Sequence, residues 1–263
     1  MFIFLGRLII FGFALGMSSG VICAETENQS ESVAGKAQLV PSLTIEAPMR
    51  DGVKIFAKVY LPQGNGRFPT LLAASAYRSD NVNAPESSLF LWRETGPIQF
   101  YLDHGYAYVH MDVRGTGRSG GEYRYHDSRE NHDLYDVVEW LAKQPWSNGK
   151  IGGIGESYYA QEQWFMAEEN PPHLSCIAPY DGNPDTYHFS AYQGGIPSAY
   201  PSLWFNDVVR PNNAWPLEGN KREITWDYAE QMLSHPLYDD FWKTRSALDG
   251  LGKIRVPVYS IGL

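Results

Sequence analysis

The stretch GIGESY, residues 153–158, constrains the fold of this chain more than any other part of the sequence. Residues 150–154 have the pattern of a short buried strand, and residues 157–169 that of a helix. A serine at a sharp strand-to-helix corner presents its hydroxyl at the end of a sheet. Gly155 suits such a corner because a side chain there would strike the turn. The alternative is that Ser157 is an ordinary helix N-cap.

The rest of the chain alternates strand-like with helix-like segments. Strands are expected at 42–47, 54–61, 70–75, 106–113, 150–154, 175–179 and 256–261, and helices at 98–104, 131–143 and 157–169. The first two strands and the turn at 49–52 predict a hairpin with one wet face. The later alternation predicts a mostly parallel sheet covered on both sides, and thus an α/β protein. Asn131 is the expected N-cap of the 131–143 helix.

The pattern changes in residues 183–250, where Trp, Tyr, Pro and Asn crowd together and the sheet periodicity is lost. We interpret this segment as a helical cap inserted over the site. A buried strand is expected to resume at 256–261.

The first residues predict export from the cell. Arg7, the apolar run 8–21 and the small-residue site at 22–24 indicate a signal peptide over residues 1–24. A membrane anchor is the alternative, but the apolar run is short for a span of about twenty residues. Residues 25–41 are expected to be a flexible leader, residues 42–263 the main domain, and the location secreted or periplasmic, with no membrane partner after cleavage.

Composition excludes several classes of partner and cofactor. The formal net charge of −9 argues against nucleic acid or an anionic membrane as the main partner. The histidines have no metal-binding spacing, so neither a metal nor another cofactor is expected. The run at 115–120 satisfies G-x-G-x-x-G, but no helix follows it directly, which argues against a dinucleotide site. We expect Asp112 and Arg114 to form a buried pair, and Cys176 to be a packed core thiol.

The chemistry expected at the corner is acyl transfer. A nucleophilic serine needs a base, a group that orients the base, and donors for the oxyanion. Ser157 would be the nucleophile, and the backbone N–H of Tyr158 would donate to the oxyanion from the start of the helix.

Three further motifs carry a resemblance to a known family. They are RDGV at 50–53, the loop DVRGTGRSGGE at 112–122, and Tyr77 within SAYR. Together with the corner, they resemble the CocE/NonD-type serine hydrolases, which include cocaine esterase, the α-amino acid ester hydrolases and the Xaa-Pro dipeptidyl-peptidases. The resemblance covers about residues 45–263, and it departs from the family's G-x-S-Y-x-G motif at Ala160.

The resemblance implies an α/β-hydrolase fold with a helical cap, and it implies that the Tyr77 hydroxyl is the second oxyanion donor. It also implies a catalytic acid after the 256–261 strand, and a histidine later, neither of which has appeared by Leu263. We therefore expect a domain incomplete at its C-terminus, without the final strands and the family's jelly-roll, as a fragment or a truncated product.

For the full-length protein we expect hydrolysis of an ester or amide bond, including an Xaa-Pro peptide bond, through an acyl-enzyme. The partner would be a small ester or amide, or a short peptide. For the chain alone we expect negligible hydrolysis, because a serine without its base loses a factor on the order of 10⁶ in turnover. The alternative is a non-catalytic binding module or an inactive truncated product. The sequence carries no signal of an oligomeric state.

Overall fold

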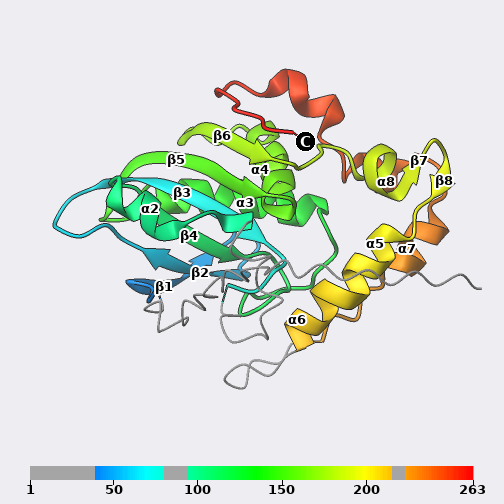
Figure 1. Cartoon of the computed structure of the whole chain (residues 1–263), viewed down its shortest axis with the longest axis horizontal. Helices are drawn as coiled ribbons and strands as arrows, with labels where there is room; N and C mark the ends of the chain where they lie inside the picture. The colour runs from blue at the N-terminus through cyan, green and yellow to red at the C-terminus, as the bar shows by residue number, and fades with distance from the viewer. Residues whose placement is uncertain (1–38, 80–93, 215–222, 263) are drawn as a thin grey trace, which may run out of the picture. The chain divides into compact units, whose positions relative to one another are not determined.

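Six strands form the central sheet of the computed structural model, which describes residues 39–79, 94–214 and 223–262. The strands are β1 Leu43–Pro48, β2 Lys54–Tyr60, β3 Phe68–Ser75, β4 Ala107–Asp112, β5 Ser147–Glu156 and β6 Leu174–Tyr180. Figure 1 shows them side by side, from β1 in blue to β6 in yellow-green. The expected signal peptide and nearly all of the leader lie outside the described residues.

The strand order is β1-β2-β4-β3-β5-β6. β1 and β2 form the expected antiparallel hairpin, and β2 continues antiparallel to β4. β3 then runs parallel to both β4 and β5, and β5 runs parallel to β6. The mostly parallel α/β sheet predicted from the sequence is therefore confirmed. The carboxyl ends of β3 and β5 lie at the same edge, which brings Tyr77 toward Ser157.

In the part of the chain that the structure describes, three helices accompany the sheet strands: α2 Ile98–Asp103, α3 Ser128–Leu141 and α4 Tyr158–Glu168. The predicted start of α3 was wrong. Its N-cap is Asp127, whose carboxylate accepts hydrogen bonds from the backbone N–H groups of Arg129 and Glu130, at 3.0 and 3.1 Å. A carboxylate at this position satisfies two free N–H groups and favours the positive end of the helix dipole, so the helix begins before Asn131.

The predicted loss of sheet periodicity after β6 is confirmed, and most of this segment is helical. It contains the α-helices α5 Tyr200–Trp204, α6 Arg210–Ala214, α7 Tyr228–Ser234 and α8 Asp240–Lys243, the π-helices η2 Tyr187–Ala191 and η3 Phe205–Val209, the 3₁₀-helix η4 Leu248–Lys253, and a small hairpin of β7 Tyr192–Gln193 and β8 Ile196–Pro197. No helix among the described residues has the length and apolar character needed to cross a membrane.

The segment 256–261 pairs with the sheet but is not buried. Tyr259 N–H donates to Ile177 O at 2.9 Å, and Ile261 N–H donates to Pro179 O at 3.0 Å, in parallel with β6. However, the side chain of Tyr259 is 69% exposed. The prediction of a buried strand was wrong because the described residues pack against Val256 but leave residues 257–261 exposed. Cys176 on β6 is likewise exposed rather than packed in the core.

The expected pair between Asp112 and Arg114 does not form. Arg114 instead forms ion pairs with Asp133 of α3, at 2.5 Å, and with Asp51 of the β1–β2 turn, at 2.8 Å. Asp112 accepts a hydrogen bond from the Ser79 backbone N–H at 2.6 Å. The predicted pair was wrong because α3 packs against the loop and places the Asp133 carboxylate beside Arg114. This buried arginine joins the turn, the glycine loop and α3.

We predict that Asp133→Ala lowers the free energy of unfolding by about 3–5 kcal/mol, because it leaves the Arg114 guanidinium buried with only the Asp51 carboxylate. The side chains of Arg114 and Asp133 are 5% and 1% exposed. The matched control on the same helix is Asp136→Ala, whose partner Arg50 is 47% exposed. An exposed pair is worth about 1 kcal/mol or less. Urea unfolding measures both, and equal losses would contradict the prediction.

Candidate active site

Ser157 occupies a strained backbone corner between β5 and α4. Its φ and ψ are 60° and −119°, which makes it one of the few described non-glycine residues with a positive φ. The corner is held by a hydrogen bond from Ser157 N–H to Tyr180 O at 3.0 Å. Such strain costs on the order of 1–3 kcal/mol and persists only where the surroundings impose it. The predicted strand, serine corner and helix are all present, and an ordinary N-cap is excluded because the Ser157 side chain caps no helix N–H.

Two glycines allow the close backbone approach that the corner at Ser157 requires. A Cβ on Gly155, whose φ is +124°, would lie 2.5 Å from the Cβ of Tyr159. A Cβ on Gly182, which follows β6, would lie 2.3 Å from the Cβ of Ala160 and 2.9 Å from Ser157 O. The glycine at 182 therefore provides space for the alanine that replaces the glycine of the family motif. A side chain at Gly155 or Gly182 would strike residues of α4, so the two glycines allow the first turn of α4 to lie close to the sheet.

Tyr158 begins α4, and its backbone N–H donates no hydrogen bond within the described part of the chain. An unused N–H at a helix N-terminus favours a negatively charged partner. The side chain of Tyr158 is buried and donates a hydrogen bond from its hydroxyl to Glu130 Oε1 of α3, at 2.6 Å. This anchors the residue that carries the free N–H.

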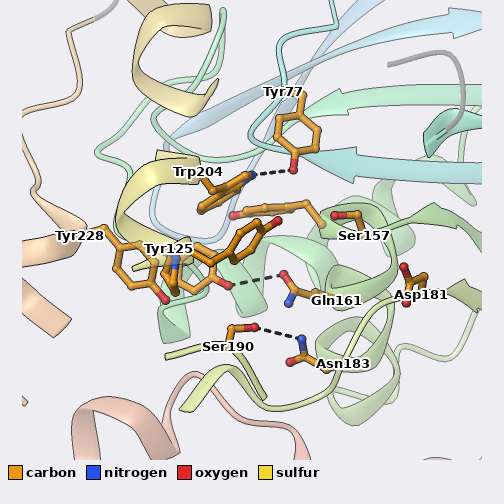
Figure 2. Close-up of a pocket in the computed structure, with 12 residues that line it drawn as sticks. Tyr77, Tyr125, Ser157, Gln161, Asp181, Asn183, Ser190, Trp204 and Tyr228 are labelled. Carbon is orange, nitrogen blue, oxygen red and sulfur yellow. Dashed lines mark hydrogen bonds between the residues drawn. The ribbon is translucent and has the colours of Figure 1, made fainter. Parts of the chain in front are cut away.

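Tyr77 lies directly after β3, is 1% exposed, and faces Ser157 across the pocket in Figure 2. Its hydroxyl accepts a hydrogen bond from Trp204 Nε1 of α5 at 2.9 Å, and the Ser157 side chain lies close to it. An indole N–H only donates, so Trp204 does not take up the hydrogen of the phenol. Burial raises the pKa of Tyr77 well above its ordinary value, so the hydroxyl stays protonated as a donor.

Glu94, which the sequence analysis did not single out, is a buried acid close to Ser157. It is 3% exposed, and its Oε2 has no hydrogen-bond partner among the described residues. Burial, and then repulsion from Glu156, raise the pKa of Glu94 to about 9. At neutral pH this carboxyl is therefore an uncharged acid beside the serine. Its place before α2, in a stretch without a motif, left no signal in the sequence.

The serine opens into a pocket of about 160 Å³. Figure 2 shows Trp204, Tyr125 and Tyr228 along one side of it, with Gln161 and Asn183 opposite. Its lining combines aromatic faces with hydroxyl and amide groups; the residues are Tyr77, Tyr125, Ser157, Tyr158, Gln161, Asp181, Asn183, Ser190, Tyr200, Pro201, Trp204 and Tyr228. Such a lining suits a small group with an apolar body and polar atoms at its edge.

The histidines of the described residues contact other groups than Ser157. His110 Nε2 lies 2.7 Å from the Tyr159 hydroxyl, and His126 Nε2 lies 3.2 Å from Gln161 Oε1. His188 pairs with Asp185, and His235 with Asp239. The structure thus brings together Ser157, Tyr77 and the Tyr158 N–H, as the sequence predicted, but no described histidine hydrogen-bonds the serine.

This sheet order, with a strained serine at the corner of β5 and α4, defines an α/β-hydrolase. The family profile for X-Pro dipeptidyl-peptidases (S15 family) matches residues 51–262. The chain belongs to this family of hydrolases.

Individual relatives agree with that assignment. The chain is 30% identical to cocaine esterase of Rhodococcus sp. (strain MB1 Bresler) over 251 residues, which are 81% of this chain and 42% of the relative. A CocE/NonD family hydrolase from Staphylococcus aureus superposes with a TM-score of 0.70 and 34% identity, over 82% of this chain and 39% of that one. An α-amino acid ester hydrolase shares the fold, with a TM-score of 0.64 at 21% identity, over 89% of this chain and 45% of that one. The chain therefore spans less than half the length of these relatives.

We predict that Ser157→Gly is more stable than Ser157→Ala by about 1 kcal/mol, because glycine adopts a positive φ without steric cost. At an ordinary helical position the order is reversed, by about 0.5–1 kcal/mol. His132, which lies inside α3 and whose side chain is 45% exposed, provides the control pair His132→Gly and His132→Ala. Thermal unfolding of the four variants measures both differences. A more stable alanine at both positions would contradict the strain at Ser157.

Proposed function

We propose that the protein containing this chain is a serine hydrolase that cleaves an ester or amide bond through an acyl-enzyme. The observation that carries the proposal is the strained corner, which holds the Ser157 hydroxyl between a free helix N-terminal N–H and a buried phenol. A serine with two such donors has the arrangement that acyl transfer needs.

The reaction has two displacement steps. Ser157 Oγ attacks the substrate carbonyl carbon while a base removes its proton. The charge that develops on the carbonyl oxygen is stabilised by the Tyr158 N–H and the Tyr77 hydroxyl. The leaving alcohol or amine departs with the proton from the base. Water then attacks the acyl-serine by the same route and releases the acid.

The base is the part that the described residues do not bring to Ser157. The relatives that match are more than twice as long as the matched segment, since 251 residues cover 42% of the cocaine esterase. We propose that a histidine and its carboxylate partner come from sequence outside this chain. This chain alone is then expected to bind substrate and to polarise it, with negligible turnover.

The substrate class follows from the pocket. Aromatic faces around the serine suit an apolar or prolyl-containing acyl group, and the hydroxyl and amide groups suit its carbonyl and amide atoms. The relatives include a cocaine esterase, and the family is that of X-Pro dipeptidyl-peptidases. A small ester or amide or a short peptide is therefore the proposed partner. The sequence of residues 1–24 supports a secreted or periplasmic location.

The alternative is a binding module that holds a ligand in the pocket without turnover. It is favoured by the absence of a histidine at Ser157 among the described residues. The two proposals differ in what happens to the serine: only the hydrolase becomes covalently acylated.

The test is steady-state and burst hydrolysis of a chromogenic ester by the natural gene product that carries this chain. Ser157→Ala should reduce turnover by a factor on the order of 10⁶. Tyr77→Phe should reduce kcat about 10²-fold, since one oxyanion donor is worth about 3 kcal/mol. Tyr200→Phe is the matched control, because Tyr200 lines the same pocket but is 59% exposed, and it should change kcat only a few-fold.

Two outcomes would overturn the proposal. The first is turnover that survives Ser157→Ala. The second is a gene product that binds the ester, releases no acid, and carries no acyl group on Ser157 by mass spectrometry, which would establish the binding module.

A further inference from the structure

Three side chains of metal-ligating types meet behind the nucleophile helix. They are His126, from the loop before α3, Glu130 of α3 and Glu162 of α4, and one ligand atom from each lies within 4.8 Å of the others. Their exposed fractions are 0, 1 and 1%. Two carboxyl groups and an imidazole are rarely buried together unless they bind one another or a ligand.

The facing atoms are not satisfied by one another. Both carboxylate oxygens of Glu162, and Nδ1 of His126, have no hydrogen-bond partner among the described residues. Nδ1 lies 2.8 Å from Glu162 Oε1, yet the geometry between them is not that of a hydrogen bond. Unpaired buried polar atoms are rare and costly, so a group that accepts their lone pairs is expected at this place.

The surrounding contacts orient these atoms inward. His126 Nε2 faces Gln161 Oε1 at 3.2 Å. With the ring proton on Nε2, toward this oxygen, Nδ1 keeps its lone pair for a cation. Glu130 receives the Tyr158 hydroxyl on Oε1 and the His126 backbone N–H on Oε2, at 2.6 and 3.1 Å. Metal-binding histidines and carboxylates are commonly held by such outer hydrogen bonds.

Charge favours a cation with two positive charges. Two carboxylates and a neutral imidazole carry a formal charge of −2, and within the described ranges no lysine or arginine forms an ion pair with Glu130 or Glu162. The nearby Arg245 donates instead to the backbone oxygens of Phe241 and Arg124, at 2.8 and 3.0 Å. A divalent ion would neutralise the cluster.

We propose that His126, Glu130 and Glu162 bind one divalent transition-metal cation, with zinc as the representative ion. One imidazole nitrogen and carboxylate oxygens are ligands that zinc accepts. Sequence analysis expected no metal, because the histidines show no recognised metal-binding spacing. The third ligand, Glu162, comes from a different helix, so the sequence does not place it beside the other two.

The ion would be structural rather than catalytic. It would join the loop before α3, α3 itself and α4, and α4 begins with the residue whose N–H faces the pocket. Gln161 lines the pocket and also contacts His126, and Tyr158 contacts Glu130. The metal would thus stabilise the position of α4 relative to α3, at a site separate from the serine. Metal binding at this site does not depend on the proposed hydrolase activity.

The competing explanation is a shared proton or a buried water. Without a cation, burial raises the pKa of Glu162 to about 8 and lowers that of His126 to about 4. The cluster would then be held by a proton between the two carboxyl groups. This arrangement predicts no metal uptake.

The test uses the whole chain, stripped with a chelator and then dialysed against zinc or, separately, manganese. The expected result is about one equivalent of metal per chain by elemental analysis, and a rise in the thermal midpoint of about 4 °C or more on reloading. Glu162→Gln and His126→Ala should abolish both effects. Glu169→Gln is the control, because it removes the same charge from a partly exposed position at the end of α4.

The wild-type measurement decides the proposal even if a variant fails to fold. Less than about a tenth of an equivalent of either metal, with an unchanged midpoint, would overturn it in favour of the proton or water. Stoichiometric uptake that persists in folded Glu162→Gln, shown by circular dichroism, would also overturn it, because the ion would then lie elsewhere.

Discussion

The site depends on one backbone constraint, the positive φ of Ser157 between β5 and α4. A sheet strand and a helix that meet at an ordinary angle would point the serine along the helix surface. Here the hydrogen bond from Ser157 N–H to Tyr180 O, and the close approach of α4 that Gly155 and Gly182 permit, turn the hydroxyl into the pocket. The same turn leaves the Tyr158 N–H beside it without a partner.

The helical segment after β6 lines much of the pocket, and one of its contacts reaches the oxyanion tyrosine. Trp204 of α5 donates to the Tyr77 hydroxyl, which belongs to the end of β3. Because the indole can only donate, the phenol hydrogen does not point toward it. The aromatic residues that crowd this part of the sequence therefore do more than enclose a pocket. One of them contacts the hydroxyl of a residue that follows a sheet strand.

The sequence predicted the parts of the fold that depend on local pattern. The β1–β2 hairpin, the central parallel strands and the serine corner follow from periodicity and short motifs, and the family resemblance singled out Tyr77. Contacts between distant segments were not predictable in this way. Arg114 forms an ion pair with Asp133, and not with its neighbour Asp112, because α3 packs across the loop. The exposure of residues 256–261 depends on which other segments pack against them, and the hydrophobic pattern of the strand does not reveal this.

The residues missed around the site share that cause. Glu94 is brought to Ser157 by the approach to α2, and Glu162 is brought to His126 by the packing of α4 on α3. Neither Glu94 nor Glu162 belongs to a sequence motif or to a spacing that indicates a site. A buried acid is visible only once its surroundings are known, because what distinguishes it is the lack of water and of a partner.

The most direct measurement of the central claim is a crystal structure of the natural gene product with a phosphonate bound covalently to Ser157. The account predicts a phosphoryl oxygen about 2.7–3.1 Å from both the Tyr158 backbone nitrogen and the Tyr77 hydroxyl oxygen. An adduct on Ser157 whose oxygens all lie beyond hydrogen-bonding distance of these two groups would contradict it.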